Sequence, residues 1–213
     1  MSSGETSPPL APARLLQRAD LDLDPVALAR RLVGVTLLCD GVGGIIVETE
    51  AYGRNDAASH SFRGPTLRNR SMFAGAGTVY VYRSYGLHWC FNLVARDEGA
   101  VLIRAIEPVV GLDLMRQRRG RVDRLADGPG RLAQALAIGA VHDGNDATAA
   151  PFALLERPAE PRIFASPRIG ISRAVDRPWR FGIEGSPWLS RRMPTATGAD
   201  RPAACVDSDE PPA

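Results

Sequence analysis

The sequence contains no lysine, because all 26 of its basic residues are arginine. A guanidinium group stays protonated at physiological pH, so the only amine in the chain is the one at its N-terminus. Catalysis through a side-chain amine, such as a Schiff base with a sugar aldehyde, is therefore excluded. Codon usage in a GC-rich genome is the preferred explanation for the missing lysines, but the chemical exclusion holds either way.

Cysteine, histidine and long apolar runs are also scarce. Cys39, Cys90 and Cys205 form an odd, widely spaced set without a CxxC pair, and the three histidines are far apart. We therefore expect no disulfide framework, no metal and no cofactor. No stretch approaches the roughly 18 apolar residues of a membrane span, and Met1–Glu5 carries no basic flank leading into an apolar segment. A soluble intracellular protein without membrane contact is expected.

The composition is that of a globular protein. The chain has 213 residues, of which 45% are hydrophobic and 23% charged, and this fits one domain with a sizeable core. Residues 1–9 and 193–213 are rich in small, polar and proline residues and cannot bury enough apolar surface to become ordered. We expect two disordered tails around a domain that spans residues 10–192.

Local patterns predict a mixture of helices and hairpins. Asp24 is a suitable N-cap before Pro25, and Gly34 is a suitable stop for the helix that follows. The order of elements favours a single α+β domain over a doubly wound sheet. Helices are predicted over 24–32, 66–73, 109–118 and 127–139, and strands over 36–39, 44–49, 78–82, 88–94, 101–106, 152–155, 162–165, 169–171 and 180–183.

The charge is unevenly distributed along the chain. Residues 60–124 hold eleven arginines and five acidic residues, a net charge of +6, so the remainder carries −4 of the overall +2. A basic face on a nearly neutral protein fits a polyanionic partner. A solvated run of charges explains the same numbers, and charge alone does not decide between the two.

Glu48, Glu50 and Tyr52 alternate along one predicted strand, so their side chains share a face if the strand continues. A carboxylate beside an aromatic ring combines a general base with a stacking surface. An exposed acidic strand end is the alternative interpretation. Only one of the two glutamates needs to be catalytic, although a close pair is also typical of glycosidases.

Three of the four tyrosines lie within seven residues around a predicted hairpin tip. Tyr80 is placed to pack inside the sheet, whereas Tyr85 falls at the turn, where it has less to pack against. Tyr85 is therefore a candidate wedge or stacking platform for nucleic acid bases. Candidate phosphate contacts nearby in the sequence are Arg63, Arg68, Arg70 and Arg83.

Two further polar residues are candidates with alternatives. His60 lies in a polar loop and is either a catalytic group or a surface side chain. Arg104 interrupts an apolar run and should be paired if it is buried, with Glu50 as a natural partner. An arginine at the sheet edge that points to solvent is the alternative.

Taken together, these motifs resemble the alkyladenine (3-methyladenine) DNA glycosylase family over residues 25–190. The resemblance implies a compact fold with a curved mixed or antiparallel sheet, flanking helices and a protruding β-hairpin that enters the minor groove. The motifs are Glu48–Tyr52, Ala58–His60, Arg68–Phe73, Tyr80–Tyr82, Tyr85–Gly86, Cys90–Asn92, Leu102–Pro108, Gly128–Pro129, Gln134–Ile138, Arg180–Phe181 and Gly185–Trp188.

The resemblance also implies a monofunctional repair enzyme. Glu50 would be the general base that activates a water to attack C1′ of the damaged nucleotide, held with the help of Arg104 and the carbonyl of Ile183. Tyr85 would fill the gap that the flipped nucleotide leaves in the duplex. The expected protein is a monomer that acts on damaged double-stranded DNA in the cytoplasm, near the nucleoid in a bacterium, without cofactor or lyase activity.

The same resemblance assigns a base pocket. Tyr52, His60 and Tyr82 would sandwich the extruded base, and Asn92 would clash with the exocyclic amino group of normal guanine. The sequence departs from the family at Arg83-Ser84 in the hairpin tip and at Gly64–Leu67, where a basic stretch is more usual.

Other functions remain open at this stage. A lesion-specific DNA-binding protein without catalysis would use the same wedge and basic segment. A hydrolase of free nucleosides would need neither of them. A metal-dependent nuclease is disfavoured because the acidic residues show no clustered ligand spacing.

Overall fold

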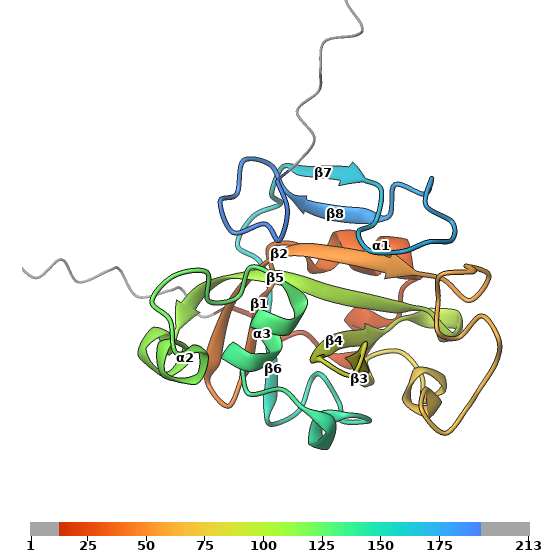
Figure 1. Ribbon diagram of the computed structural model, residues 1–213, viewed down its shortest axis with the longest axis horizontal. Helices are drawn as coiled ribbons and strands as arrows, with labels where there is room; N and C mark the ends of the chain where they lie inside the picture. The colour runs from red at the N-terminus through yellow and green to blue at the C-terminus, as the bar shows by residue number, and fades with distance from the viewer. Residues whose placement is uncertain (1–12, 193–213) are drawn as a thin grey trace, which may run out of the picture.

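The computed structural model describes residues 13–192, and within them eight strands form one antiparallel sheet that curls around the core (Figure 1). The strand order is β3-β4-β5-β2-β1-β6, with β8 paired to β2 and β7 paired to β8. The α+β prediction with a curved sheet is confirmed, whereas both predicted tails lie outside the described residues. The strands are β1 (Thr36–Cys39), β2 (Val42–Tyr52), β3 (Val79–Ser84), β4 (His88–Val94), β5 (Ala100–Val110), β6 (Phe152–Leu155), β7 (Ile163–Ser166) and β8 (Arg180–Ile183).

Strand β2 lies at the centre of this sheet. It pairs with β5 over nearly its whole length, while its other edge pairs first with β1 and then with β8. At Gly43 and Gly44 the neighbouring strands approach so closely that an added Cβ would lie 1.9 Å from the carbonyl oxygens of Leu37 and Glu107. Only glycine fits at these two positions. The close approach of the neighbouring strands there lets the long strand β2 curl, while its second half stays paired with β5 on one edge and β8 on the other.

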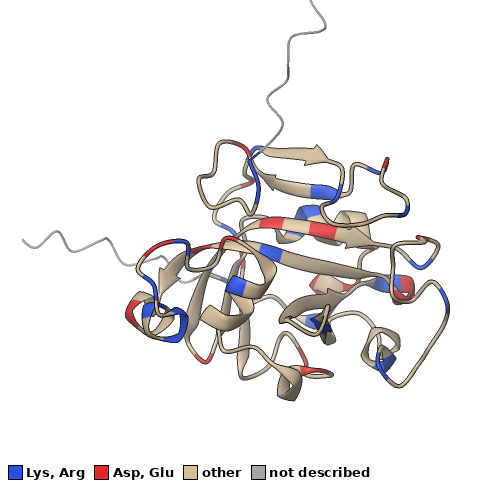
Figure 2. Cartoon of the chain, viewed as in Figure 1, with Lys and Arg blue, Asp and Glu red and all other residues tan. Residues whose placement is uncertain are grey.

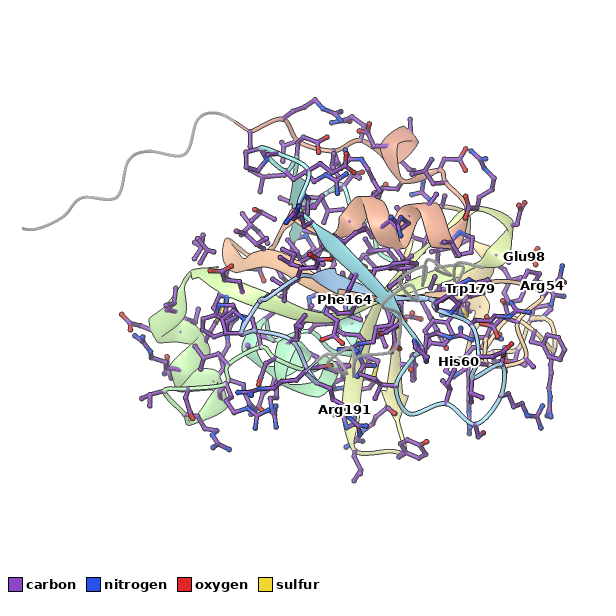
Figure 3. All side chains as sticks on the ribbon, turned by 90° about the horizontal axis from the view of Figure 1, so that it is seen from above. Arg54, His60, Glu98, Phe164, Trp179 and Arg191 are labelled. Carbon is purple, nitrogen blue, oxygen red and sulfur yellow. The ribbon has the colours of Figure 1, made fainter. Side chains whose placement is uncertain are left out.

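Helices cover both faces of the sheet (Figures 1 and 3). The Asp24 carboxylate caps α1 by accepting from Val26 N and Ala27 N, both at 3.0 Å, as its sequence predicts. α1 packs on β2 and β5, and α3 packs on β4 and β5. The helices are α1 (Pro25–Leu32), α2 (Leu112–Arg119) and α3 (Pro129–Ala135), with single 3₁₀ turns at Arg18–Leu21, Arg70–Phe73, Arg96–Glu98 and Ala140–His142.

Some predicted boundaries differ from the structure. The helix predicted over 66–73 is a 3₁₀ turn at its end, and the one over 127–139 is shorter at both ends. β5 continues to Val110, because its last residues pair with the glycines of β2, so α2 begins only at Leu112. Residues 169–171 form no strand, since the amide of Ile169 bonds a carboxylate instead of a neighbouring strand.

Candidate active site

Two buried glutamates lie next to each other on one face of β2. Glu48 and Glu50 are both 0% exposed. In Figure 2 the acidic segments of β2 lie between basic segments of β5 and β8. The alternative of an exposed acidic strand end is therefore wrong.

Arg104 of β5 bridges these glutamates. Its Nη1 donates to Glu50 Oε2 at 3.1 Å and its Nε donates to Glu48 Oε1 at 3.2 Å. Its side chain is 9% exposed, so the predicted pairing with Glu50 is confirmed and the solvent-facing alternative is wrong. Burial alone would lower the pKa of Arg104, but the charges of Glu50 and Glu48 outweigh burial and raise it.

The two glutamates differ in how many of their lone pairs are used. Glu48 accepts from Arg104, from Arg180 Nε at 2.6 Å, and from Ser190 N and Oγ at 2.5 and 2.9 Å. Glu50 accepts from Arg104 Nη1, from Tyr52 OH at 2.8 Å and from Ile169 N at 2.7 Å. A carboxylate offers about four lone-pair sites. Glu48 accepts four donors, three of them on Oε1, whereas Glu50 accepts three, and its Oε1 bonds only the Ile169 amide and can accept one more.

A cavity of about 590 Å³ opens next to the donors that bond Glu50, although Glu50 itself is not among the residues that line it. Tyr52 and Arg104, which both bond Glu50, form part of its wall. This volume is in the range of small-molecule sites and is ample for a purine. The predicted pocket residues Tyr52, His60, Tyr82 and Asn92 all line it, together with Tyr80, Met72, Cys90, Leu102 and residues 169–173.

Aromatic side chains form much of the cavity wall. His60 and Tyr82 contact each other edge to face at 4.5 Å, and Tyr80 stacks behind Tyr82 at 5.5 Å between ring centroids. His60 Nδ1 is 2.8 Å from the hydroxyl of Tyr80. Tyr52 also lines the cavity, and within the described residues it makes no ring contact with this group.

Burial keeps these walls uncharged at neutral pH. It raises the pKa of the Tyr52, Tyr80 and Tyr82 hydroxyls, with the neighbouring Glu50 adding to the effect on Tyr52. It lowers the pKa of His60 from 6.5, because the imidazolium form would lose hydration. Asn92 is also buried, and its Nδ2 donates to Tyr80 O at 3.0 Å and to Cys90 O at 3.3 Å.

The β3–β4 hairpin extends away from the sheet (Figure 3). Tyr80 packs in its base and is 3% exposed, whereas Tyr85 at the tip is 87% exposed, as the sequence predicts. Leu87, which the sequence analysis did not single out, is 77% exposed at the same tip. Two large apolar side chains held in solvent on a narrow projection are unusual in a monomer and fit a binding role.

The four arginines predicted to contact phosphate are exposed. None of them has a carboxylate within ion-pair distance among residues 13–192, which leaves their charges available. Arg83 lines the cavity mouth and lies over the Trp89 ring at 5.7 Å. The others, Arg63, Arg68 and Arg70, lie in the segment that runs from the His60 loop to the Arg70–Phe73 turn.

Further site residues were missed by the sequence analysis. The amide of Ile169 bonds Glu50, and the preceding Arg168 forms a buried ion pair with Asp56 while its guanidinium lies 4.6 Å from the centre of the Tyr52 ring. Ile183, whose carbonyl was expected to hold water, pairs with β7 and does not line the cavity. No short-range sequence pattern marks Arg168, because its partner is 112 residues away.

No helix among residues 13–192 is long and apolar enough to cross a membrane. The same part of the chain holds no group of three or more His, Cys, Asp or Glu side chains that could bind a metal ion.

The chain belongs to the methylpurine-DNA glycosylase family, whose pattern it matches over residues 19–187. A protein of Nitrosospira multiformis named "Putative 3-methyladenine DNA glycosylase" is 54% identical over 178 residues, which cover 81% of this chain and 92% of the relative. Proteins with the same name from Rhodopseudomonas palustris and Agrobacterium fabrum are 51% and 52% identical, and the matches cover 90% and 87% of this chain and 95% and 94% of the relatives. Family and relatives together support a DNA glycosylase of the 3-methyladenine type, and the resemblance in the sequence is confirmed.

Proposed function

We propose that the protein extrudes an alkylated or deaminated purine from duplex DNA into the cavity and hydrolyses its N-glycosidic bond, leaving an abasic site. The observation that carries this proposal is Glu50. It is a buried carboxylate with one unused acceptor position, and the three residues that it bonds, Tyr52, Arg104 and Ile169, all line an aromatic cavity. The proposed substrates are 3-methyladenine, 7-methylguanine, hypoxanthine and ethenoadenine.

In the proposed reaction, a water molecule donates one hydrogen bond to the remaining acceptor position of Glu50. The water oxygen attacks C1′ of the sugar, its proton passes to the carboxylate, and the C1′–N bond breaks with its electron pair going to the purine. The negative charge of Glu50 also stabilises the positive charge that develops on the sugar. Arg104 and the Ile169 amide hold the carboxylate in position. No amine takes part, so the expected product is an intact strand with an abasic site.

Selectivity would begin with the cost of extrusion. Flipping a base costs a few kcal/mol, and less for a lesion that pairs poorly. Stacking between Tyr52 and the His60–Tyr82 pair returns about 1–3 kcal/mol, and a cationic alkylpurine gains a further cation–π attraction. A neutral His60 avoids repelling such a cation. Asn92, which lines the cavity, is the residue proposed to oppose the amino group of normal guanine.

The hairpin would enter the DNA. Tyr85 is the proposed wedge that fills the space of the extruded nucleotide, and the exposed Arg63, Arg68, Arg70 and Arg83 are the proposed phosphate contacts. These contacts require a duplex, so the free nucleoside is not the expected substrate. The proposed working unit is one chain, because the cavity and the hairpin are complete within it.

The test is single-turnover excision from duplex oligonucleotides with hypoxanthine or ethenoadenine, and release of methylated bases from alkylated DNA, in EDTA. Wild type should leave alkali-sensitive sites without cutting the strand. Glu50→Gln should bind lesion DNA but release no base, while the control Glu98→Gln, in an exposed pair with Arg54, should act like wild type.

Other outcomes would point to other functions. Tight lesion binding by wild type without release of any base would favour a non-catalytic DNA-binding protein. Salt-insensitive activity on a free nucleoside would favour a nucleoside hydrolase. Loss of excision in EDTA would mean that a metal ion takes part.

A further inference from the structure

The guanidinium of Arg168 lies against the ring of Tyr52, one of the aromatic side chains that line the cavity. It is 4.6 Å from the centre of the Tyr52 ring and 5.3 Å from that of Trp179, which is labelled in Figure 3. The Arg168 side chain is 0% exposed and does not line the cavity, whereas Tyr52 does. The guanidinium therefore lies behind the Tyr52 ring, on the side away from the cavity.

Several contacts fix this guanidinium in place. Asp56, also 0% exposed, forms a salt bridge with Nη1, and its Oδ1 accepts from Nη2 at 3.1 Å. The backbone oxygens of Ala51 and Ala174 accept from Nη1 at 2.8 Å and from Nη2 at 3.2 Å. The Nε is buried and has no acceptor within the described residues, so the rings of Tyr52 and Trp179 help to balance its charge. These contacts hold the positive charge at a fixed place behind the ring.

Tyr82, another ring of the cavity wall, has neutral neighbours instead. Tyr80 stacks on it at 5.5 Å between ring centroids, and His60 contacts it edge to face at 4.5 Å. Burial lowers the pKa of His60, so its imidazole is neutral at neutral pH. Among residues 13–192, no guanidinium lies over the ring of Tyr82. The two tyrosines of the cavity wall therefore differ in the charge behind them.

The lining of the cavity is itself rich in positive charge. It includes Arg83, Arg104 and Arg173 and, within the described part of the chain, no aspartate or glutamate. Glu50 is paired with Arg104 and does not line the cavity. A positively charged base would therefore enter a cavity whose wall already carries charge of the same sign, whereas a neutral base would not be repelled.

We propose that Arg168 is a specificity-determining residue, whose charge behind Tyr52 biases the cavity towards neutral damaged purines. The inference rests on the proposed function. A cation is attracted to the π electrons of an aromatic ring, and a cation already on one face draws those electrons away from the other face. Tyr52 then still stacks on a base by dispersion and burial of apolar area, but it attracts a positively charged base less than Tyr82 does.

This bias fits the needs of the two kinds of substrate. A cationic alkylpurine is already a good leaving group, so its excision depends less on how tightly the base is held. A neutral base such as hypoxanthine or ethenoadenine has a stronger bond to the sugar, and its excision depends more on residence in the cavity. A cavity that favours neutral bases therefore gives most help to the substrates that need it most.

The experiment compares the affinity for two duplexes whose lesions differ in charge. One duplex carries 7-methylguanine, which is cationic, and the other carries hypoxanthine, which is neutral, each opposite cytosine. Every protein also carries Glu50→Gln, so that no base is released during the measurement. The readout is the ratio of the two dissociation constants. The cost of extruding each base is the same for every variant, so it cancels when the ratios are compared.

Arg168→Gln/Asp56→Asn removes both charges of the buried pair and leaves neither uncompensated. Relative to the protein with Glu50→Gln alone, its ratio should shift by about 3- to 10-fold in favour of 7-methylguanine, the contribution of one cation–π interaction. Arg168→Lys keeps the positive charge and should keep the ratio. The control Arg96→Gln/Asp22→Asn neutralises an exposed pair outside the cavity lining and should keep the ratio as well.

A second arm leaves the buried pair intact and decides the question even where the first variant does not fold. Tyr82→Leu should weaken binding of 7-methylguanine more than that of hypoxanthine, whereas Tyr52→Leu should weaken both by about the same factor.

Two results would overturn the proposal. One is an unchanged ratio in a folded Arg168→Gln/Asp56→Asn protein, and the other is a Tyr52→Leu protein that loses 7-methylguanine as selectively as Tyr82→Leu does. Failure of the protein with Glu50 intact to release any base would refute the proposed function instead. The ratios of dissociation constants would still decide the role of Arg168, because they do not depend on excision.

Discussion

Replacing Arg104 by methionine should destabilise the protein by leaving a buried charge uncompensated. Glu48 keeps Arg180 and Ser190 as partners, but Glu50 loses its only ionic partner and retains only neutral donors. Breaking one side of a buried pair costs about 3–5 kcal/mol. With an m-value of about 2 kcal/mol per molar urea, the unfolding midpoint should fall by about 1.5–2.5 M.

A double variant tests whether the uncompensated charge is the cause. In Arg104→Met/Glu50→Gln the residue at position 50 is neutral. The free energy of unfolding should then be only about 1–2 kcal/mol lower than that of wild type, which corresponds to the loss of one or two hydrogen bonds. Arg54→Met, which removes the exposed pair with Glu98 labelled in Figure 3, should cost less than about 1 kcal/mol. Equal costs for the single variants at Arg104 and Arg54, or additive costs in the double variant, would refute this reasoning.

Three more changes have defined outcomes. Tyr85→Ala should weaken lesion-duplex binding by about 10- to 100-fold, the contribution of one stacked ring. Its melting temperature should not change, because the side chain is 87% exposed. An equal loss of affinity for a free nucleoside would contradict the proposed wedge role of Tyr85. Arg168→Met should unfold at a urea midpoint at least 1 M lower than Arg168→Lys, because leaving Asp56 without its buried ionic partner costs about 3–5 kcal/mol. Equal midpoints would show that charge is not what stabilises this site. The pKa of His60 in the folded protein lies below its ordinary value of 6.5, so below pH 6.5 the unfolded chain binds more protons than the folded protein does. The free energy of unfolding of wild type should therefore fall from pH 7 to pH 5 more steeply than that of His60→Gln.

Elements with strong local signals were predictable. Asp24 and Pro25 mark the start of α1, and the strand pair that ends in Tyr85 forms as its residues suggest. Glu50 and Arg104 were paired in advance because a buried arginine requires a carboxylate nearby. The family resemblance supplied the remaining pocket residues, which the structure brings around one cavity.

Contacts between distant segments were not predictable in this way. Residues 169–171 have the apolar composition of a strand, yet the Ile169 amide bonds Glu50 across 119 positions of sequence. Arg168 looks like one more surface arginine in a chain that has many. Its burial follows only from the placement of Asp56, Tyr52 and Trp179 around it.

The bonds of Glu48 also set the order in which the site can assemble during synthesis. Ser190 follows Glu48 by 142 residues, and both its amide and its hydroxyl complete the partner set of that carboxylate. While the chain is still being translated, β2 can pair with β1 and β5, but a charged carboxylate at its centre still lacks Arg180 and Ser190. Contacts this distant in sequence close late, since the entropy of a long loop must be lost first. The centre of β2 is therefore among the last parts of the sheet to reach its final state, so the proposed site is complete only after the chain has folded through Ser190.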